Sequence, residues 1–384
     1  MRMAHDTHTA NIAARFAPGA CHRLVVKIGS ALLVDPAGAI RREWLAGVVE
    51  DVAERVHAGQ QVAIVSSGAI ALGARRLGLA KGGRASLEDA QAAAATGQIG
   101  LSRAWAELLH AQGLTAAQML VTLGDLEERR RYLNAAATLD RLLSLGVVPI
   151  INENDSVATA EIRFGDNDRL AARIAQAAGA GGVILLSDVD GLYTANPTRD
   201  PNAKLIPEVA QIDARIRAMA DDGSDSGMGS GGMVSKLAAA RIAQTGGAHL
   251  AIASGKRDRP LSAFAADGRG TLFLAASGTR ARKAWLAGRL TARGRIVVDD
   301  GAVAALRHGS SLLAAGAKAV EGNFVRGDVV EIVDATGVAV ARGLVEYNAA
   351  DAARIVGRRS AAHAELLGYA PRAAMIHRDH LVLI

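Results

Sequence analysis

The sequence predicts an α/β protein, with a central, mainly parallel sheet sandwiched by helices, followed by a small β-rich domain. Three observations support this prediction. Short, β-branched apolar runs alternate with long helical patterns from residue 23 to about residue 255, and nearly every run ends in small or polar residues. After about residue 290 the pattern changes to short strand-like pieces broken by glycine and aspartate. Strands buried on both faces of a parallel sheet are continuous apolar runs, and intervening helices are the usual crossovers.

Six apolar runs are expected to be strands of the first domain. They occupy residues 23–29, 61–68, 114–122, 146–154, 181–189 and 249–255. Helical patterns separate them, for example 42–59 and 125–146, the second with Asp125 as its N-cap and its end at Gly146. In such sheets, ligands bind beyond the carboxyl ends of the strands.

The expected organisation is an N-terminal extension (1–22), an α/β domain (23–276), a polar, basic linker (277–293) and the β-rich domain (294–375). A length of 384 residues suits two or three domains. The extension is interpreted as loose, without the apolar core of a signal peptide, and no run reaches the length of a membrane-spanning helix. With Cys21 as the only cysteine, the simplest compartment is a reducing one, so we expect a cytoplasmic protein without membrane contact.

The chain is basic, with a net charge of +6 and a pI of about 9.7. This charge permits anionic partners such as nucleotides or RNA but does not require them. Most of it is arginine, and lysine occurs only at positions 27, 81, 204, 236, 256, 283 and 318. Lysines beside glycine-rich turns are therefore candidate functional residues.

Polar and small residues follow strand after strand. They are Lys27, Gly29 and Ser30; Ser66, Ser67 and Gly68; Asn152, Asn154 and Asp155; and Ser187, Asp188 and Asp190. At one edge of a parallel sheet they would line a single crevice in which glycine lets a ligand approach the backbone. Any one Gly-Ser pair is more often an ordinary turn, so it is the recurrence that favours a site.

A glycine-rich loop, Met228 to Lys236, leads into a helical pattern. A helix N-terminus favours phosphate, and Lys236 would point back toward it. A flexible surface loop is the alternative interpretation of this segment. For Lys27, the alternative is a lysine at a strand end whose side chain reaches solvent. The chain contains no Walker loop, because Gly255-Lys256 lacks the required glycine spacing.

Acidic and amide residues crowd the stretch 151–175. They are Asn152, Glu153, Asn154, Asp155, Glu161, Asp166, Asn167 and Asp168. Paired carboxylates are compatible with a divalent metal or with general acid and base roles, and Asp166 is favoured as a helix cap. Amides and carboxylates together also suit a zwitterionic amino acid.

Successive motifs resemble the glutamate 5-kinase family of the amino acid kinase superfamily. They are "VVKIGS", "VSSGAIALG", "QMLVT", "VPIINENDSVATAEIRFGDNDRLAA", "LLSDVDGLYTANP" and "GSGGMVSKLAAA", and the C-terminal residues 297–332 resemble a PUA domain. The resemblance covers essentially all of the chain after residue 22. It implies the amino acid kinase fold and transfer of the γ-phosphoryl group of ATP to the side-chain carboxylate of L-glutamate, the first step of proline biosynthesis.

The resemblance also implies roles for individual residues. Lys27 and Lys236 would flank the phosphates, and Asp168 would orient both lysines. The residues implied for glutamate are Ser67, Gly68, Asn154, Asp155 and Asn167. Those implied for ATP are Lys27, Gly29, Ser187, Asp188, Ser230, Gly231, Gly232, Met233, Val234, Ser235 and Lys236. Mg²⁺ would travel on the ATP phosphates, with no protein ligand named. Ser66, Ser187 and Val234-Ser235 are small departures from the family pattern.

Feedback inhibition by proline and a homodimer or homotetramer are expected from the resemblance alone. Two alternatives remain at this stage: a different acceptor within the superfamily, and RNA binding through the PUA-like domain. The second is weakened because the tail shows no evident aromatic stacking platform, Phe324 and Tyr347 being candidates for core residues.

Overall fold

The structure is a computed structural model that describes residues 12–157, 166–221, 232–276 and 292–384. The described chain forms two compact units, one built mainly from residues 12–276 and the other mainly from residues 292–384. The domain limits expected from the sequence stay a prediction, since most of the linker, like residues 1–11, falls outside the described residues.

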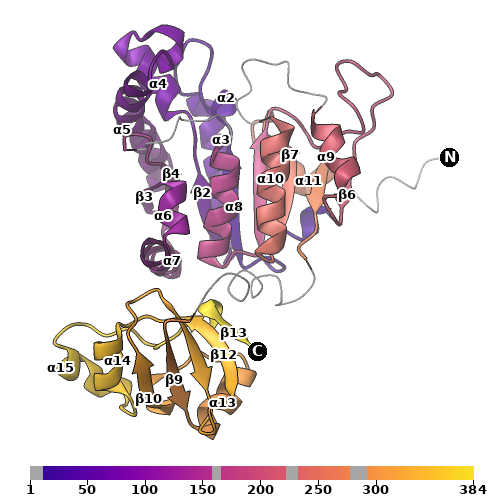
Figure 1. Ribbon diagram of the computed structural model, residues 1–384. Coiled ribbons are helices and arrows are strands. Elements are labelled where there is room, and N and C mark those ends of the chain that lie inside the picture. Colours follow the sequence, from indigo (N-terminus) through magenta and orange to yellow (C-terminus); the bar gives the residue numbers. More distant parts are fainter. Residues whose placement is uncertain (1–11, 158–165, 222–231, 277–291) are drawn as a thin grey trace. The chain divides into compact units, whose positions relative to one another are not determined.

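The first unit is built on an eight-stranded sheet with the order β3-β4-β2-β1-β5-β7-β8-β6 (Figure 1). Its strands are β1 (Arg23–Ile28), β2 (Gln61–Val65), β3 (Ala116–Val121), β4 (Val148–Glu153), β5 (Gly182–Ser187), β6 (Glu208–Val209), β7 (His249–Ser254) and β8 (Gly270–Phe273). Every neighbouring pair is parallel except β7 and β8. The mainly parallel sheet and its six expected strands are confirmed, whereas β6 and β8 were not expected.

Helices cover both faces of this sheet. They are α2 (Ser30–Leu33), α3 (Arg42–His57), α4 (Ala69–Leu77), α5 (Leu87–Ala111), α6 (Leu123–Glu127), α7 (Arg129–Ser144), α8 (Asp166–Ala178), α9 (Ala214–Asp221), α10 (Met233–Thr245) and α11 (Pro260–Asp267), with a 3₁₀ turn η1 at Ala80–Gly83. Residues of α3, α5 and α11 share one buried cluster with the sheet, and residues of α8 and α10 share another (Figure 1). The side chains of each central strand alternate between the two clusters, as Val25 and Val26 do.

The helix expected at 125–146 is two helices in the structure. Asp125 is not its N-cap: the backbone N–H of Asp125 donates to Thr122 Oγ1 over 3.1 Å, and the N–H of Thr122 donates to Asp125 Oδ2 over 2.8 Å. This reciprocal capping starts the first helix at Leu123. The Glu128 carboxylate then accepts hydrogen bonds from the N–H groups of Arg130 and Arg131 and so caps a second helix.

Residues 12–22 are not a loose extension, contrary to the sequence interpretation. Phe16 is fully buried, and its ring lies 6.0 Å from that of Phe264. Its carbonyl oxygen accepts hydrogen bonds from Arg55 and from Gln60. The segment therefore belongs to the buried cluster that α3, α5 and α11 share with the sheet.

Two glycines let α4 and α5 touch through their backbones. A Cβ atom at Gly97 would overlap the carbonyl oxygen of Ala69, and one at Gly73 would overlap that of Ala93. This contact holds α4, the helix that begins directly after the Ser67-Gly68 turn, against α5. Gly68 itself has φ +100°, a left-handed conformation that favours glycine.

Replacing Gly97 with alanine is expected to destabilise the protein by about 1–3 kcal/mol, because the added methyl group must push two backbones apart. Gly100 is the matched control, since it lies in the same helix and a Cβ there meets nothing within 4 Å. The Gly100→Ala variant should be neutral or more stable by up to about 1 kcal/mol. Urea unfolding followed by circular dichroism compares them, and equal midpoints for the two variants would contradict the close contact.

The second unit contains a five-stranded sheet with the order β10-β9-β11-β12-β13. Its elements are β9 (Gly294–Val298), α13 (Asp300–Arg307), η2 (Ala314–Gly316), β10 (Ala317–Gly322), β11 (Val329–Val333), β12 (Ala339–Leu344), α14 (Ala349–Ile355), η3 (Ser360–Ala362), α15 (His363–Leu367), η4 (Arg378–His380) and β13 (Leu381–Leu383). The β-rich prediction is confirmed. One piece expected to be strand-like contains the helix α13 instead. The Asp299 carboxylate caps this helix by accepting a hydrogen bond from the backbone N–H of Ala302.

None of the helices in the described ranges combines the length and the apolar character needed to cross a bilayer.

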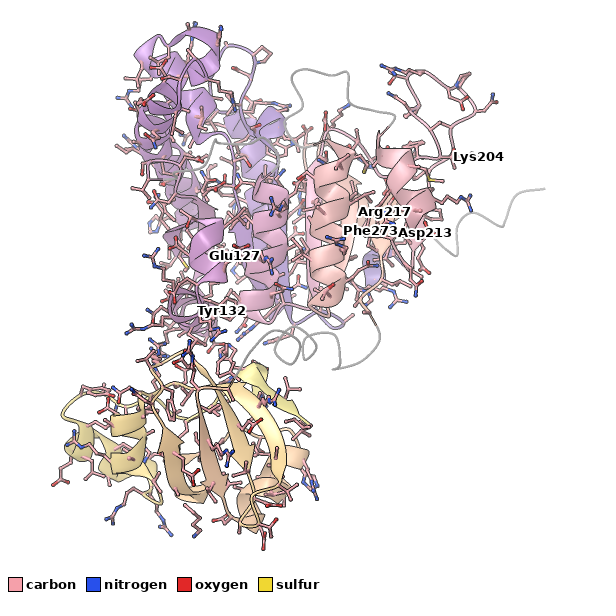
Figure 2. All side chains as sticks on the ribbon, viewed as in Figure 1. Glu127, Tyr132, Lys204, Asp213, Arg217 and Phe273 are labelled. Atoms are coloured by element: carbon pink, nitrogen blue, oxygen red, sulfur yellow. The ribbon has the colours of Figure 1, made fainter. Side chains whose placement is uncertain are left out.

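Figure 2 labels Phe273, the last residue of β8, whose side chain is fully buried in the first unit. It also labels Asp213, whose carboxylate accepts a hydrogen bond from the N–H of Ile216 and caps α9.

Candidate active site

The candidate site lies at the carboxyl edge of the parallel strands. Lys27 is in the middle of this edge, since it pairs with Val65 of β2 on one side and with Leu185 of β5 on the other. β4 lies beyond β2, and β7 lies beyond β5. The strand-end residues proposed from the sequence are therefore brought to one edge, as expected.

Lys27, Asp168 and Lys236 form a buried cluster of alternating charge. The Nζ atom of Lys27 lies 2.6 Å from Asp168 Oδ1, and the Nζ atom of Lys236 lies 3.2 Å from Asp168 Oδ2. Asp168 is fully buried, and the two lysines are 7% and 5% exposed, so none of the three charges is solvated by bulk water. They come from three separate elements, β1, α8 and α10.

Burial and pairing act in opposite directions on these groups. Burial disfavours the charged carboxylate of Asp168, but the ammonium groups of Lys27 and Lys236 outweigh it and hold the pKa of Asp168 below its usual value. Burial lowers the pKa of Lys27, and the carboxylate of Asp168 offsets only part of this effect while Lys236 adds to it. The cluster of one carboxylate and two ammonium groups has a net positive charge, which the nearby carboxylate of Asp188 offsets in part and which a bound anion would neutralise further.

A second group of polar side chains surrounds Asn167. Its Nδ2 atom donates to Ser67 Oγ over 2.8 Å and to Asn152 Oδ1 over 3.1 Å. It also lies 3.2 Å from the carbonyl oxygen of Ser66, which can only accept and so fixes the orientation of the amide. The Oδ1 atom of Asn167 is buried and has no hydrogen-bond partner among the described residues. It is an acceptor available to a ligand with an N–H or ammonium group.

Asn154 and Asp155 follow β4 and extend this polar region. Asn154 is half-buried, and its Oδ1 accepts a hydrogen bond from Ser156 Oγ over 2.7 Å. Asp155 is 9% exposed and interacts electrostatically with Arg84, whose pKa burial lowers and Asp155 partly restores. Sequence reasoning did not propose Arg84, which follows the tight turn η1.

A cavity of about 890 Å³ lies on the other side of the lysine cluster. Its lining includes eight of the residues proposed for nucleotide binding: Lys27, Gly29, Ser187, Asp188, Gly232, Met233, Val234 and Lys236. Ser235 does not line it, and Ser230 and Gly231 lie outside the described residues, as does the side chain of Asp166. An added Cβ at Gly29 would make only ordinary van der Waals contacts, with the carbonyl oxygen of Leu186 at 3.7 Å and with Lys27 Nζ at 3.9 Å.

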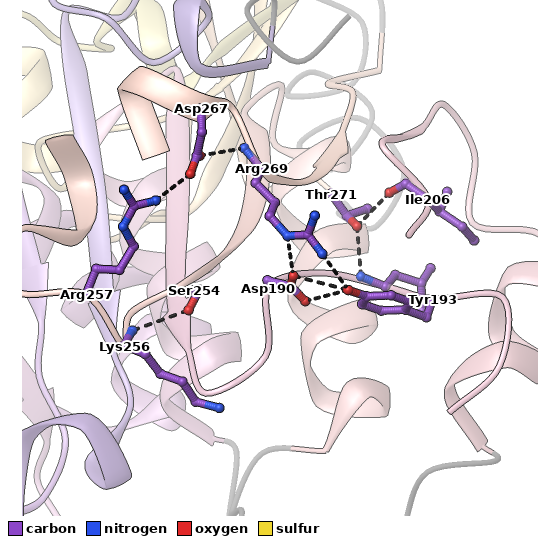
Figure 3. A network of polar contacts seen from close by, with 10 residues as sticks. Asp190, Tyr193, Ile206, Ser254, Lys256, Arg257, Asp267, Arg269 and Thr271 are labelled. Carbon is purple, nitrogen blue, oxygen red and sulfur yellow. Dashed lines mark hydrogen bonds and ion pairs between the residues drawn. The ribbon is translucent and has the colours of Figure 1, made fainter. Parts of the chain in front are cut away.

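The lining of this cavity also holds a polar network (Figure 3) that joins Asp190, a strand-end residue proposed from the sequence, to partners that the sequence did not indicate. Arg269 donates to Asp190 over 2.7 Å and to the hydroxyl of Tyr193 over 3.1 Å. Beside it, Arg257 pairs with Asp267 (Figure 3). Lys256, considered in the sequence only to exclude a Walker loop, also lines the cavity. No local pattern indicates these pairs, since Asp190 and Arg269 are 79 positions apart in the chain.

Together these features suit the transfer of a phosphoryl group. Such a transfer depends on alignment and on neutralising negative charge more than on covalent participation by the protein. The two buried ammonium groups lie between the nucleotide-sized cavity and the polar region around Asn167. A polyanion in the cavity and a small amphoteric acceptor near Asn167 would meet at Lys27 and Lys236.

Two regions of the chain match known families. Residues 22–254 match the model of the amino acid kinase family, and residues 294–367 match that of the PUA domain. A glutamate 5-kinase from Sphingopyxis alaskensis is 72% identical over 369 residues, covering 96% of this chain and 99% of that protein. Another from Zymomonas mobilis is 62% identical over 380 residues, covering 99% of this chain and 96% of that protein.

A third protein named glutamate 5-kinase, from Novosphingobium aromaticivorans, is 61% identical over 364 residues, which is 95% of this chain and 96% of that protein. Among solved structures, one described as isopentenyl phosphate kinase aligns with a TM-score of 0.45 and 18% identity. That alignment covers 66% of this chain and all of the other.

Proposed function

The chain belongs to the amino acid kinase family, and on that premise we propose that it catalyses the glutamate 5-kinase reaction. ATP phosphorylates the side-chain carboxylate of L-glutamate, giving L-glutamyl 5-phosphate in the first step of proline biosynthesis. The relatives that support this function are 72%, 62% and 61% identical over nearly the whole chain.

The observation that carries the assignment within the site is the position of the lysine pair. Lys27 and Lys236 both line the cavity and both pair with Asp168 behind it. Their ammonium groups are therefore held in place before a nucleotide arrives and need little reorganisation during the reaction. We propose that they contact the β- and γ-phosphates and that Asp168 acts by positioning them.

The chemistry needs no general base, because a glutamate side chain with a pKa near 4.3 is already ionised at neutral pH. One carboxylate oxygen bonds to the γ-phosphorus, the bond from that phosphorus to the β,γ-bridging oxygen breaks, and ADP leaves with the electron pair. The protein must relieve the repulsion between two anions and align them. Lys27, Lys236 and the backbone around Gly29 and Gly232 supply these two functions.

Glutamate is proposed to bind on the Asn167 side, with contacts from Ser67, Gly68, Asn154, Asp155 and Asn167. The Oδ1 atom of Asn167, for which the described residues offer no hydrogen-bond partner, supports this placement, because an amino acid brings an ammonium group that can donate to it. The carboxylate of Asp155, 9% exposed, provides a second partner for that ammonium group.

Magnesium is proposed to enter on the phosphates of ATP, where it would neutralise part of their charge. Within the described ranges, no group of three or more His, Cys, Asp or Glu side chains is arranged to hold a metal ion.

Three further properties are proposed: a cytoplasmic location, which the single cysteine of the sequence favours, and feedback inhibition by proline and a homodimer or homotetramer, which follow from the family resemblance alone. Titration of activity with proline and light scattering of the purified protein test the last two.

RNA binding is the less favoured alternative. Phe324 and Tyr347, the two aromatic residues of the second unit considered in the sequence, are both 2% exposed, whereas Tyr369 is 48% exposed. Rings buried in the core cannot stack on bases, so these two residues do not provide the platform that single-stranded RNA recognition uses.

Incubation with MgATP and L-glutamate, with hydroxylamine to trap the acyl phosphate, tests the proposed reaction. We expect glutamyl hydroxamate with glutamate and none with aspartate, N-acetylglutamate or no acceptor. Hydroxamate with one of the other acceptors would reassign the substrate within the family. Folded protein that binds ATP but forms no hydroxamate with any of them would overturn the proposal.

A further inference from the structure

Two buried tryptophans support the active site from outside it. Trp44 of α3 is 3% exposed, and Trp105 of α5 is fully buried. Each uses its only polar atom, the indole Nε1–H, to donate to a segment at the carboxyl edge of the sheet. The third tryptophan, Trp285, lies outside the described residues.

Trp44 holds the nucleotide side. Its Nε1–H donates to the carbonyl oxygen of Gly255 over 2.8 Å and to that of Arg257 over 3.1 Å. These carbonyl groups flank Lys256, and both Lys256 and Arg257 line the cavity while no residue of α3 does. The indole therefore reaches the cavity wall only through the backbone.

The same face of α3 also contacts the rest of that loop and the first turn of α11. A Cβ at Gly47 would overlap the carbonyl oxygen of Asp258, so only glycine allows this approach. Asp51 Oδ2 accepts from the N–H of Leu261 over 2.8 Å and from that of Ser262 over 3.2 Å. Positions 44, 47 and 51 lie on one face of a helix, which makes α3 a continuous support for the loop from β7 to α11.

Trp105 holds the glutamate side in the same way. Its Nε1–H donates to Ser66 Oγ over 3.1 Å. Seven positions earlier on α5, Gln98 Oε1 accepts from Asn152 Nδ2 over 2.9 Å. Ser66 and Asn152 are two of the groups to which Asn167 donates. Helix α5 thus fixes the partners of Asn167.

We propose that Trp44 and Trp105 are positioning residues that act separately: Trp44 sets the affinity for the nucleotide, and Trp105 sets the affinity for glutamate. The inference rests on the proposed function for the identity of the two ligands. Loss of an indole N–H leaves a buried acceptor without its donor, and the segment that carries it must shift to find another. Since the two segments lie on opposite sides of Lys27, each shift should affect one ligand.

The test is a pair of matched variants, Trp44→Phe and Trp105→Phe, which keep an aromatic ring and remove the donor. We expect Trp44→Phe to raise KM for MgATP about five- to tenfold with KM for glutamate changed less than about twofold. Trp105→Phe should give the reverse pattern. The proposal would be wrong if both KM values changed equally in each variant. It would also be wrong if the variants only had lower melting temperatures, with neither KM changed, since both tryptophans would then be general core residues.

Calorimetric binding of MgADP separates this inference from the proposed function, because it requires no turnover. If the wild type forms no glutamyl hydroxamate, the proposed function fails. In that case weaker MgADP binding by Trp44→Phe, with unchanged binding by Trp105→Phe, would still support the role of Trp44. Should either phenylalanine variant misfold, Asp51→Ala and Gln98→Leu test the same two supports, and unchanged KM values there would count against the proposal.

Discussion

Replacement of Lys236 with methionine should lower kcat about 100- to 1,000-fold, the range found when one preorganised donor is removed from a developing charge. Lys236 is 5% exposed and its Nζ lies 3.2 Å from Asp168 Oδ2, so its position is set before the substrates bind. We expect KM for glutamate to change little, because the glutamate contacts are proposed on the Asn167 side. Steady-state rates from the hydroxamate assay, with each substrate varied in turn, provide the measurement.

Two control variants define this result. Lys236→Arg keeps the charge but places a larger, planar group in a buried space, so it should recover only part of the rate. Lys318→Met removes a 63% exposed lysine of the second unit and should leave kcat unchanged. A Lys236→Met variant with near wild-type kcat and only a raised KM for MgATP would mean that Lys236 binds the nucleotide without stabilising the transferred group.

Replacement of Asp168 with asparagine should be the most destabilising change in the site. It leaves the ammonium groups of Lys27 and Lys236 buried without their shared counter-charge, and removal of one partner from a buried ion pair typically costs about 3–5 kcal/mol. Activity should fall as well, since both lysines lose the group that orients them. Urea denaturation at neutral pH measures the first effect.

The pH dependence of the Asp168→Asn defect has a definite sign. In the wild type, the lowered pKa of Asp168 contributes stability that is present above the ordinary value near 3.9 and is lost as pH falls through the lowered value. In the variant, the pKa of Lys27 should fall further, because Asp168 is the main group that raises it. Rising pH then relieves the burial of that charge, so the difference in stability between wild type and variant should shrink toward alkaline pH.

A double variant provides the control for this interpretation. Asp168→Asn combined with Lys236→Met removes one of the two uncompensated charges and should be more stable than Asp168→Asn alone. If the double variant is instead less stable by the sum of the two single effects, the ion pairs make no coupled contribution.

Much of the first unit could be predicted from local patterns. The apolar runs located β1, β2, β4, β5 and β7, because a strand buried on both faces leaves little room for polar side chains. The run for β3 was also located, although β3 is an edge strand and most of its residues are not buried. The short strands β6 and β8, the last two in the sheet order, were missed, since four residues such as Gly270–Phe273 carry too little pattern. The break between α6 and α7 was missed for another reason. The break depends on the Glu128 carboxylate, which accepts a hydrogen bond from the backbone N–H of Arg131 and so caps α7. Helical periodicity does not indicate such a contact.

By itself, the sequence determined the elements, the polar strand ends and the residues that resemble a kinase motif, because these depend on neighbours in the chain. Only the tertiary structure decided which of them meet. Lys27, Asp168 and Lys236 span more than 200 positions, yet they form one buried cluster because β1, α8 and α10 pack together. The same holds for the supports from Trp44 and Trp105. A buried hydrogen bond across 211 positions, such as that from Trp44 to Gly255, produces no pattern in the local sequence, since packing decides which acceptor lies next to the donor.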